Sequence, residues 1–318
     1  MRVMGRTVLV ILLLLALVAG CSREAGKPAG GGRLTVVTTM FPLYDFCRAI
    51  GGDRVDVSLL LPPGVEPHSF EPRPEDILRI SRAGLFIYTN RYMEPWAVDI
   101  LKGAGGAATL PVDAGAGVAY LSEEEEHGGE EEHGGEHGHG HGGMDPHIWL
   151  SPANARIMVD NILAAMVKQD PANREFYGKN AAAYREKLAR LDEEFRTGLA
   201  GCRTRVFLHG GHFAFGYLAQ RYGLHYVSAY GLSANAEPTP GRMAELVRTM
   251  KREGLRYIFY EELFSPKTAD TIARETGATL LKLHGIHNLT REELAGGATY
   301  LSLMEQNLRN LEAGLSCR

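Results

Sequence analysis

Histidines are the side chains whose spacing in this 318-residue chain most readily suggests chemistry. There are twelve, and five of them lie in one Glu- and Gly-rich stretch, residues 122–143. Four others each fall just past an expected strand or just before a helix that leaves a sheet. These four are His68, His147, His212 and His284. The acid pair Glu261 and Glu262 holds a similar place, directly after a strand expected at residues 256–260.

A set of imidazoles indicates a metal site. Neutral imidazole nitrogen suits zinc in tetrahedral geometry, with bonds of about 2.0–2.1 Å, whereas calcium and magnesium require oxygen ligands. Three or four histidines therefore indicate zinc or another late first-row ion, and manganese fits only if a carboxylate such as Glu261 completes the shell. Because the ligands must be unprotonated, metal affinity is expected to fall as the pH drops through the ordinary histidine range near 6.5.

The elements that must position these residues alternate between strands and helices, which implies parallel βαβ units. Strands are expected at residues 34–39, 55–61, 85–88, 205–208, 224–228, 256–260 and 279–283. Helices are expected at residues 43–50, 74–82, 151–168, 170–199 and 298–315. Open parallel sheets bind ligands at the carboxyl ends of their strands, so the four histidines and the acid pair could face one cleft.

The helix expected at 170–199 is long enough to link two separate lobes. At 1.5 Å per residue it spans roughly 42 Å, more than the diameter of one small lobe. We therefore expect an α/β fold with two lobes, each built on a parallel-type sheet, joined by a single long helix. The expected boundaries are 33–169 for the N-terminal lobe, 170–200 for the connecting helix and 201–318 for the C-terminal lobe.

The N-terminal sequence predicts an export signal followed by a tether. Residues 1–20 begin with Arg2 and Arg6 and continue as an apolar run too short to cross a membrane, which is typical of a signal peptide. The small residues before Cys21 resemble the lipobox of bacterial lipoproteins, in which this cysteine is lipidated. Residues 21–32 suit a flexible tether, and the lipid would hold the protein outside the cytoplasm, on a membrane surface.

The remaining cysteines exclude a cysteine zinc site. Cys47, Cys202 and Cys317 are odd in number and show no C-x-x-C spacing. Outside the cytoplasm, one disulfide is possible, with Cys202 and Cys317 the best pair because both flank the second lobe. Three buried free thiols fit the sequence equally well.

The negative charge of the chain is concentrated in one segment. The formal charge is −4, but residues 122–143 hold eight Glu, and the rest of the chain sums to +4. No strong basic field remains for nucleic acid, which argues against that class of partner. The loop is low in complexity and must be solvated, and its histidines are candidates for weak, accessory metal capture. They are His127, His133, His137, His139 and His141. The alternative is a dispensable insertion.

Beyond these patterns, the chain resembles the zinc- and manganese-binding solute-binding proteins of ABC importers, the ZnuA-like family. The matching runs are FPLYDFCRAIGGDRVDV, LPPGVEPHSFEP, MEPW, DPHIWLSP, HFAFGYLAQRYGL, FSPKTADTIARETGA and YLSLMEQNLRNL. They extend from residue 34 nearly to the end of the chain. The resemblance implies two α/β lobes, a rigid connecting helix, and one metal ion held between the lobes for delivery to a membrane permease by a monomeric protein.

The resemblance also implies a ligand set. The histidine of GVEPH is His68, that of DPHIW is His147, and the one four residues before a Gly-Tyr is His212. Manganese-binding members often carry a carboxylate at the third position, so zinc is favoured over manganese here. At the fourth position many relatives have aspartate and this chain has His284, with Glu261, Glu66 or water as alternatives. His287 is a weaker candidate, interpreted as an orienting or surface residue.

Two other classes of protein remain as rivals. A secreted zinc hydrolase would need an open coordination position and a base such as Glu261 or Glu66, but the chain has no H-E-x-x-H motif and a fourth histidine would exclude water. An adhesin of the same fold is the second rival. The expected protein is therefore a zinc carrier and not an enzyme.

Overall fold

The structure is a computed structural model that describes residues 32–103, 109–122, 143–232, 238–263 and 265–318. Leu34–Arg318 form one compact unit. The expected signal at residues 1–20, the lipidation site Cys21, nearly all of the tether and the five histidines of the acidic loop lie outside the described residues. Within the part that is described, no helix has the length and apolar character needed to span a membrane.

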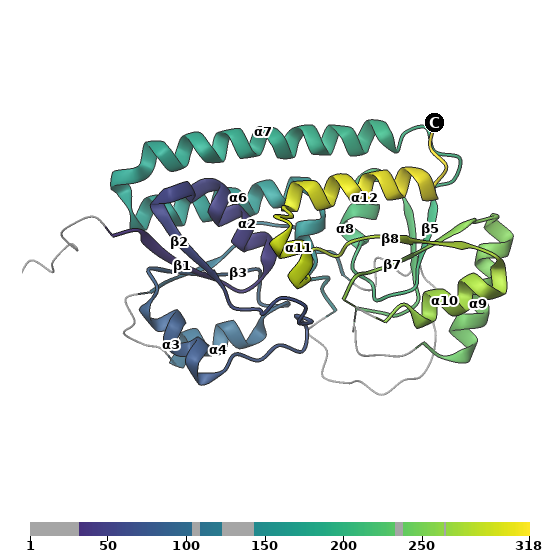
Figure 1. The fold of residues 1–318 in the computed structure, drawn as a ribbon, viewed down its shortest axis with the longest axis horizontal. Helices are drawn as coiled ribbons and strands as arrows, with labels where there is room; N and C mark the ends of the chain where they lie inside the picture. The colour runs from purple at the N-terminus through teal and green to yellow at the C-terminus, as the bar shows by residue number, and fades with distance from the viewer. Residues whose placement is uncertain (1–31, 104–108, 123–142, 233–237, 264) are drawn as a thin grey trace, which may run out of the picture. The chain divides into compact units, whose positions relative to one another are not determined.

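The first half of the unit is a parallel sheet with its helices, followed by the two long helices α6 and α7 (Figure 1). Its elements are β1 Leu34–Thr38, α2 Phe41–Gly51, η1 Gly52–Arg54, β2 Val55–Leu59, α3 Pro74–Arg82, β3 Leu85–Tyr88, α4 Pro95–Gly103, β4 Leu110–Asp113, η2 Ile148–Leu150, α6 Pro152–Gln169, η3 Pro171–Asn173 and α7 Arg174–Gly198. The strand order is β2-β1-β3-β4 and every pair is parallel. The sequence did not reveal β4, because it is short and carries a proline at the edge of the sheet.

The second half repeats the same arrangement. Its elements are β5 Val206–His209, α8 Gly216–Tyr222, β6 His225–Ser228, α9 Pro240–Glu253, β7 Tyr257–Tyr260, α10 Lys267–Thr276, β8 Thr279–Lys282, α11 Arg291–Ala295 and α12 Tyr300–Gly314. The strand order β6-β5-β7-β8 is again wholly parallel. The α/β fold class with two parallel sheets is confirmed, while the three domain boundaries stay a prediction.

A shared core joins the two sheets. One face of each sheet has a small core of its own, around Phe86 under α3 and α4 and around Ile258 under α9 and α10. The other faces contribute to one continuous cluster that also includes residues of α2, α6, α7 and α12. A close-packed common core resists deformation, so large separations of the two halves are disfavoured.

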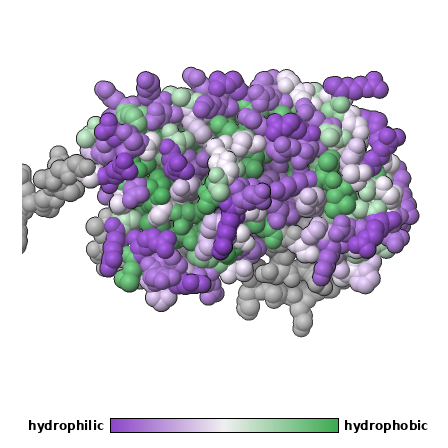
Figure 2. Space-filling model, viewed as in Figure 1, coloured by the Kyte–Doolittle hydropathy of each residue, from purple (hydrophilic) through white to green (hydrophobic). Residues whose placement is uncertain are grey.

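Helix α7 is amphipathic along its whole length. Most of its buried side chains recur every three or four residues, which places them in one stripe. They are Tyr177, Ala181, Tyr184, Leu188, Leu191, Asp192 and Phe195. Hydrophilic side chains cover its outer side in Figure 2, in the region where Figure 1 shows α7. At about 1.5 Å per residue its 25 residues span about 37 Å, enough to lie along both sheets.

The chain after β8 returns to the first half. The Phe41 amide donates to the His287 carbonyl (3.2 Å), and the Tyr300 hydroxyl donates to the Trp149 carbonyl (2.6 Å). Near the end of the chain, Cys202 and Cys317 form a disulfide, and Cys47 is a buried free thiol. Of the two alternatives open from the sequence, the structure therefore contains the disulfide.

Candidate metal centre

Four imidazoles meet at the carboxyl ends of the two sheets. His68 lies in the loop after β2, His147 directly before η2, His212 after β5 and His287 after β8. One ring nitrogen from each lies within 4.8 Å of the other three. The structure thus brings together three histidines singled out from the sequence, but it places His287 rather than His284 with them.

Asp145 determines which nitrogen His147 presents to this group. Its Oδ1 lies 2.7 Å from the ring Nδ1 and also accepts the His147 backbone N–H (2.9 Å). Both side chains are fully buried. With Nδ1–H donating to the carboxylate, the neutral ring carries its lone pair on Nε2, which faces the other histidines.

Glu261 holds His212 in the same way from the second sheet. Its Oε1 lies 2.7 Å from His212 Nδ1 and 3.3 Å from the His212 backbone nitrogen. Glu261 can come this close to His212 only because residue 211 is glycine, since a Cβ at that position would collide with Glu261 Oε1. Glu261, an alternative ligand on sequence grounds, is thus placed as the acceptor that orients a ring.

The two oriented rings create an electrostatic conflict that a cation would relieve. His147 Nε2 lies 3.2 Å from His212 Nε2 and 3.2 Å from His68 Nε2. Lone pairs facing each other at this distance repel, unless a proton or a metal ion lies between them. A tetrahedral zinc site with bonds of about 2.0–2.1 Å separates its nitrogens by about 3.3 Å, which matches the two distances.

His287 completes the group without a hydrogen bond. Its ring is 1% exposed, and neither nitrogen has a hydrogen-bond partner within the described part of the chain. The ring centroids of His147 and His212 lie 5.2 Å and 5.4 Å away. The preceding residue, Ile286, has φ 57°, which is rare for a β-branched residue and turns the chain sharply after β8. An unpaired buried imidazole is costly, so this ring gains most from a ligand.

Burial favours the neutral form of the three buried rings, those of His147, His212 and His287. It lowers the pKa of His147 and of His287 well below the usual histidine value, and neighbouring histidines lower both further. It also lowers the pKa of His212 to about 4, against the opposing effect of Glu66 and Glu262. The same burial raises the pKa of Glu261 well above its ordinary range. Neutral imidazoles are the form that binds metal, so the group is prepared for a cation at neutral pH.

His284 has a different environment from the one expected of a ligand. Its Nδ1 lies 3.0 Å from Glu262 Oε1 and its Nε2 lies 3.5 Å from Glu293 Oε1. Burial acts to lower its pKa, but the two carboxylates together raise it above the ordinary value. With its pKa raised and both ring nitrogens facing carboxylates, this ring is less suited to bind a metal than the neutral rings. The ring that lies with those of His68, His147 and His212 is instead that of His287, three positions further along.

The alternative Glu66 lies beside the site as a support for the backbone. Its carboxylate accepts the amide N–H groups of His68 (2.7 Å) and Ser69 (2.9 Å). Sequence reasoning did not identify the roles of Asp145 and Glu66 in holding the rings. Their signal was local, because each acid stands two residues before a candidate histidine, in DPH and EPH.

Comparison with known proteins shows the family to which this chain belongs. The model of the family "Zinc-uptake complex component A periplasmic" (ZnuA) matches residues 36–314. The chain is 44% identical over 310 residues to the high-affinity zinc uptake system protein ZnuA of Bacillus subtilis, covering 96% of each protein. It is 38% identical over 281 residues to the zinc-binding lipoprotein AdcA of Streptococcus pneumoniae, covering 88% of this chain and 56% of AdcA.

A solved structure shows the same fold. The Zn(II)-bound ZnuA-like domain of Streptococcus pneumoniae AdcA superposes with a TM-score of 0.76 at 35% identity. The match covers 89% of this chain and 99% of that domain. With a family model matched over most of its length and a relative 44% identical throughout, this chain belongs to the ZnuA family of zinc-uptake components.

Proposed function

We propose that this protein is the extracytoplasmic component of a zinc importer: it binds one zinc ion between its two sheets and delivers the ion to an ABC permease. The observation that carries the proposal is the pair of carboxylate-held imidazoles, His147 and His212, whose Nε2 atoms face each other at 3.2 Å. The family is one of transport components, and its zinc-bound relative has the same fold.

The proposed ligands are His68, His147, His212 and His287. All four donors are imidazole nitrogens, while the carboxylates of Asp145 and Glu261 contact ring Nδ1 atoms. Such a donor set favours zinc, because manganese prefers carboxylate and other oxygen ligands. Zinc is the cargo in this proposal, and manganese remains the less favoured alternative.

The same ligand set argues against an enzyme. A catalytic zinc keeps one coordination position open for water, with a general base beside it. Four imidazoles fill a tetrahedral shell, and Glu261 is engaged with His212. We therefore propose a carrier with no hydrolytic activity.

Delivery requires that the protein stay near its permease. Lipidation at Cys21, with residues 21–32 as a tether, would raise the local concentration of the zinc-loaded protein at the membrane surface. The common core between the sheets favours small shifts of loops around the ion over wide opening. We propose that the protein acts as a monomer.

The acidic loop, residues 122–143, is proposed as an accessory collector of zinc. Ser122 and Met144 form an antiparallel bridge, so the loop leaves and rejoins the fold immediately before Asp145. Its five histidines, outside the described residues, would bind cations weakly because ordering a Gly-rich, low-complexity sequence around an ion costs entropy.

The first prediction concerns the protons released when zinc binds. Because burial opposes a charge on either member of the His212–Glu261 pair, the pair holds a single proton in the empty site, and the other buried rings are already neutral. At pH 5.5 we expect zinc to displace no more than about two protons, because His147 and His287 are already neutral. Calorimetry in buffers of different ionisation enthalpy measures this number. Four histidines with an ordinary pKa of about 6.5 would release nearly four protons, a result that would refute the electrostatic account.

A second prediction separates the two candidates for the fourth ligand. Replacing His287 with alanine should lower zinc affinity by more than about 10-fold, the smaller loss seen when only a ligand's partner is removed. His284→Gln should leave zinc affinity unchanged and reduce thermal stability, because it disrupts the contacts with Glu262 and Glu293. Competition with a chelator and thermal unfolding measure the two effects. The opposite pattern would reassign the ligand to His284.

Thirdly, the combined variant His68→Ala, His147→Ala and His212→Ala should lose tight zinc binding and keep its circular dichroism spectrum. The matched control is His225→Ala, which removes an exposed histidine of β6. Isothermal calorimetry of both proteins measures affinity and stoichiometry. Retention of one zinc ion at unchanged affinity in the triple variant would mean that the site lies elsewhere.

The fourth prediction addresses location and delivery. Cys21→Ser should move the protein from the membrane fraction to the soluble extracytoplasmic fraction, because the residue that would carry the lipid is removed. A strain relying on this variant should grow more slowly in zinc-depleted medium and recover when zinc is added. If the variant stays with membranes and growth is normal, the anchor at Cys21 is wrong.

A further inference from the structure

The loop that carries His68, residues 60–73, has little secondary structure of its own to hold it. It contains no helix or strand, and four of its residues are prolines, which lack an N–H donor. Two backbone hydrogen bonds lie inside it, from Val65 to the Pro62 carbonyl and from Phe70 to the Pro67 carbonyl. The position of this loop therefore depends on its neighbours.

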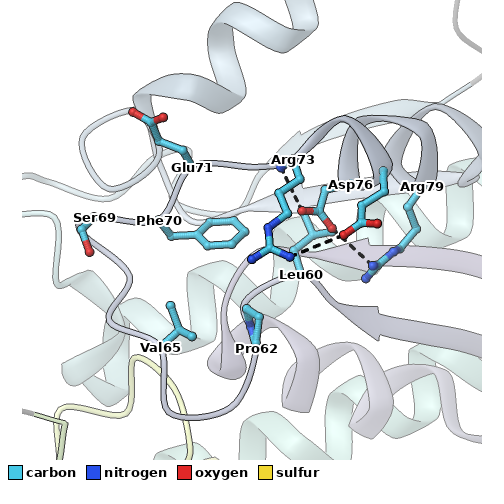
Figure 3. A pocket seen from close by; sticks show the side chains of 10 residues that line it. Leu60, Pro62, Val65, Ser69, Phe70, Glu71, Arg73, Asp76 and Arg79 are labelled. Carbon is cyan, nitrogen blue, oxygen red and sulfur yellow. Dashed lines mark hydrogen bonds and ion pairs between the residues drawn. The ribbon is translucent and has the colours of Figure 1, made fainter.

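On the side facing α3, the loop borders an open pocket. Figure 3 shows Pro62, Val65 and Phe70 on the loop, with Arg73 at the end of the loop and Arg79 of α3 across from them, all lining this pocket. Because the space between them is not filled by side chains, packing against α3 contributes little to fixing the segment around Pro62 and Val65. Support has to come from another direction.

That support comes from Asn288, 223 residues further along the chain. Its side-chain amide donates to the Val65 carbonyl (3.0 Å) and to the Pro62 carbonyl (2.7 Å). The Gly64 amide returns a hydrogen bond to the Leu289 carbonyl (2.8 Å). The Asn288 side-chain oxygen accepts the Leu289 N–H (2.8 Å), which fixes the orientation of the amide, and the residue is fully buried.

Asn288 directly follows His287, so the same short segment presents one imidazole and holds the loop that presents another. The segment is itself anchored, since Trp149 Nε1 donates to the Gly285 carbonyl (2.9 Å) and the Phe41 amide donates to the His287 carbonyl (3.2 Å). The rings of His68 and His287 lie 5.8 Å apart, centroid to centroid. A shift of the Asn288 amide would therefore change the distance between the His68 and His287 rings.

We propose that Asn288 is a positioning residue that sets the distance between His68 and His287, and with it the affinity of the site for its ion. The inference rests on the proposed zinc-binding function. Asn288 touches no metal and acts only through the backbone of residues 62–65. Removing its two donors leaves two buried carbonyls with fewer partners and frees the His68 loop, while His147 and His212 keep their own carboxylates.

The test combines Asn288→Asp with His68→Ala in a double-mutant cycle on the full chain. Aspartate has nearly the same shape as asparagine but lacks the donating NH₂ group. We expect Asn288→Asp to weaken zinc binding about 10- to 100-fold, as for other partners that orient ligands, and to have little further effect once His68 is alanine. Asn288→Ala, which adds no charge, should act in the same direction and replaces the aspartate variant if that one fails to fold.

The matched control is Asn161→Asp. Asn161 of α6 also donates two hydrogen bonds to backbone carbonyls, those of Ala114 and Ala116, both at 2.9 Å, but it does not hold a ligand loop. It should leave zinc affinity unchanged. Cobalt(II) provides a spectroscopic measure, because the visible absorption of the Asn288→Asp protein should approach that of His68→Ala.

Hydrogen exchange in zinc-free protein separates this inference from the proposed function. The exchange rate of the Gly64 amide should rise in Asn288→Asp and stay the same in Asn161→Asp. This expectation holds whether or not the wild-type protein binds zinc. Equal losses of zinc affinity with and without His68, or an unchanged Gly64 exchange rate, would overturn the positioning role. A wild-type chain that binds no zinc would instead refute the function itself.

Discussion

The site depends on two hydrogen bonds between a buried carboxylate and a buried imidazole, Asp145 to His147 and Glu261 to His212. Each hydrogen bond places the proton on Nδ1 and leaves the lone pair of Nε2 directed at the same small volume. Two such lone pairs 3.2 Å apart are unfavourable without a cation between them. The rest of the fold must hold the two rings in place against this repulsion. A bound metal ion would replace the repulsion with two favourable bonds and so stabilise the folded protein.

The fold supplies that arrangement by repeating one topology. Both sheets have four parallel strands, in equivalent orders, and the polar residues come from loops at the carboxyl ends of strands in both. The common core beneath the sheets holds the two sets of loops at a constant separation. After β8 the chain returns to the first half and adds the fourth ring, that of His287. Hydrogen bonds from Phe41 and Trp149 hold this segment against the first half. Four imidazoles from distant stretches of sequence therefore share one rigid framework.

Local patterns predicted most of the framework. Apolar runs identified seven of the eight strands, and the Ser-Pro before residue 153 predicted the start of α6, where the Ser151 side chain accepts the Asn154 N–H. The strand that the sequence did not predict, β4, is four residues long and contains proline. His68, His147 and His212 could be selected because strand ends of parallel sheets gather at one edge. Their coordination of an ion remains a prediction, as do the domain boundaries and the lipid anchor.

From the sequence alone it was possible to determine the α/β class, the resemblance to zinc-uptake proteins and the three histidines in distinctive local contexts. The tertiary structure decided the rest, including the disulfide between Cys202 and Cys317 and the use of Glu261 to orient a ring. It also placed His287, and not His284, beside the other three histidines, although the two stand only three residues apart in the same loop. Ile286, with φ 57°, turns the chain there, and Glu262 and Glu293 contact the His284 ring while the His287 ring lies with the other histidines. Those two carboxylates come from a different loop and from a later helix, so the outcome depends on contacts that no local pattern records.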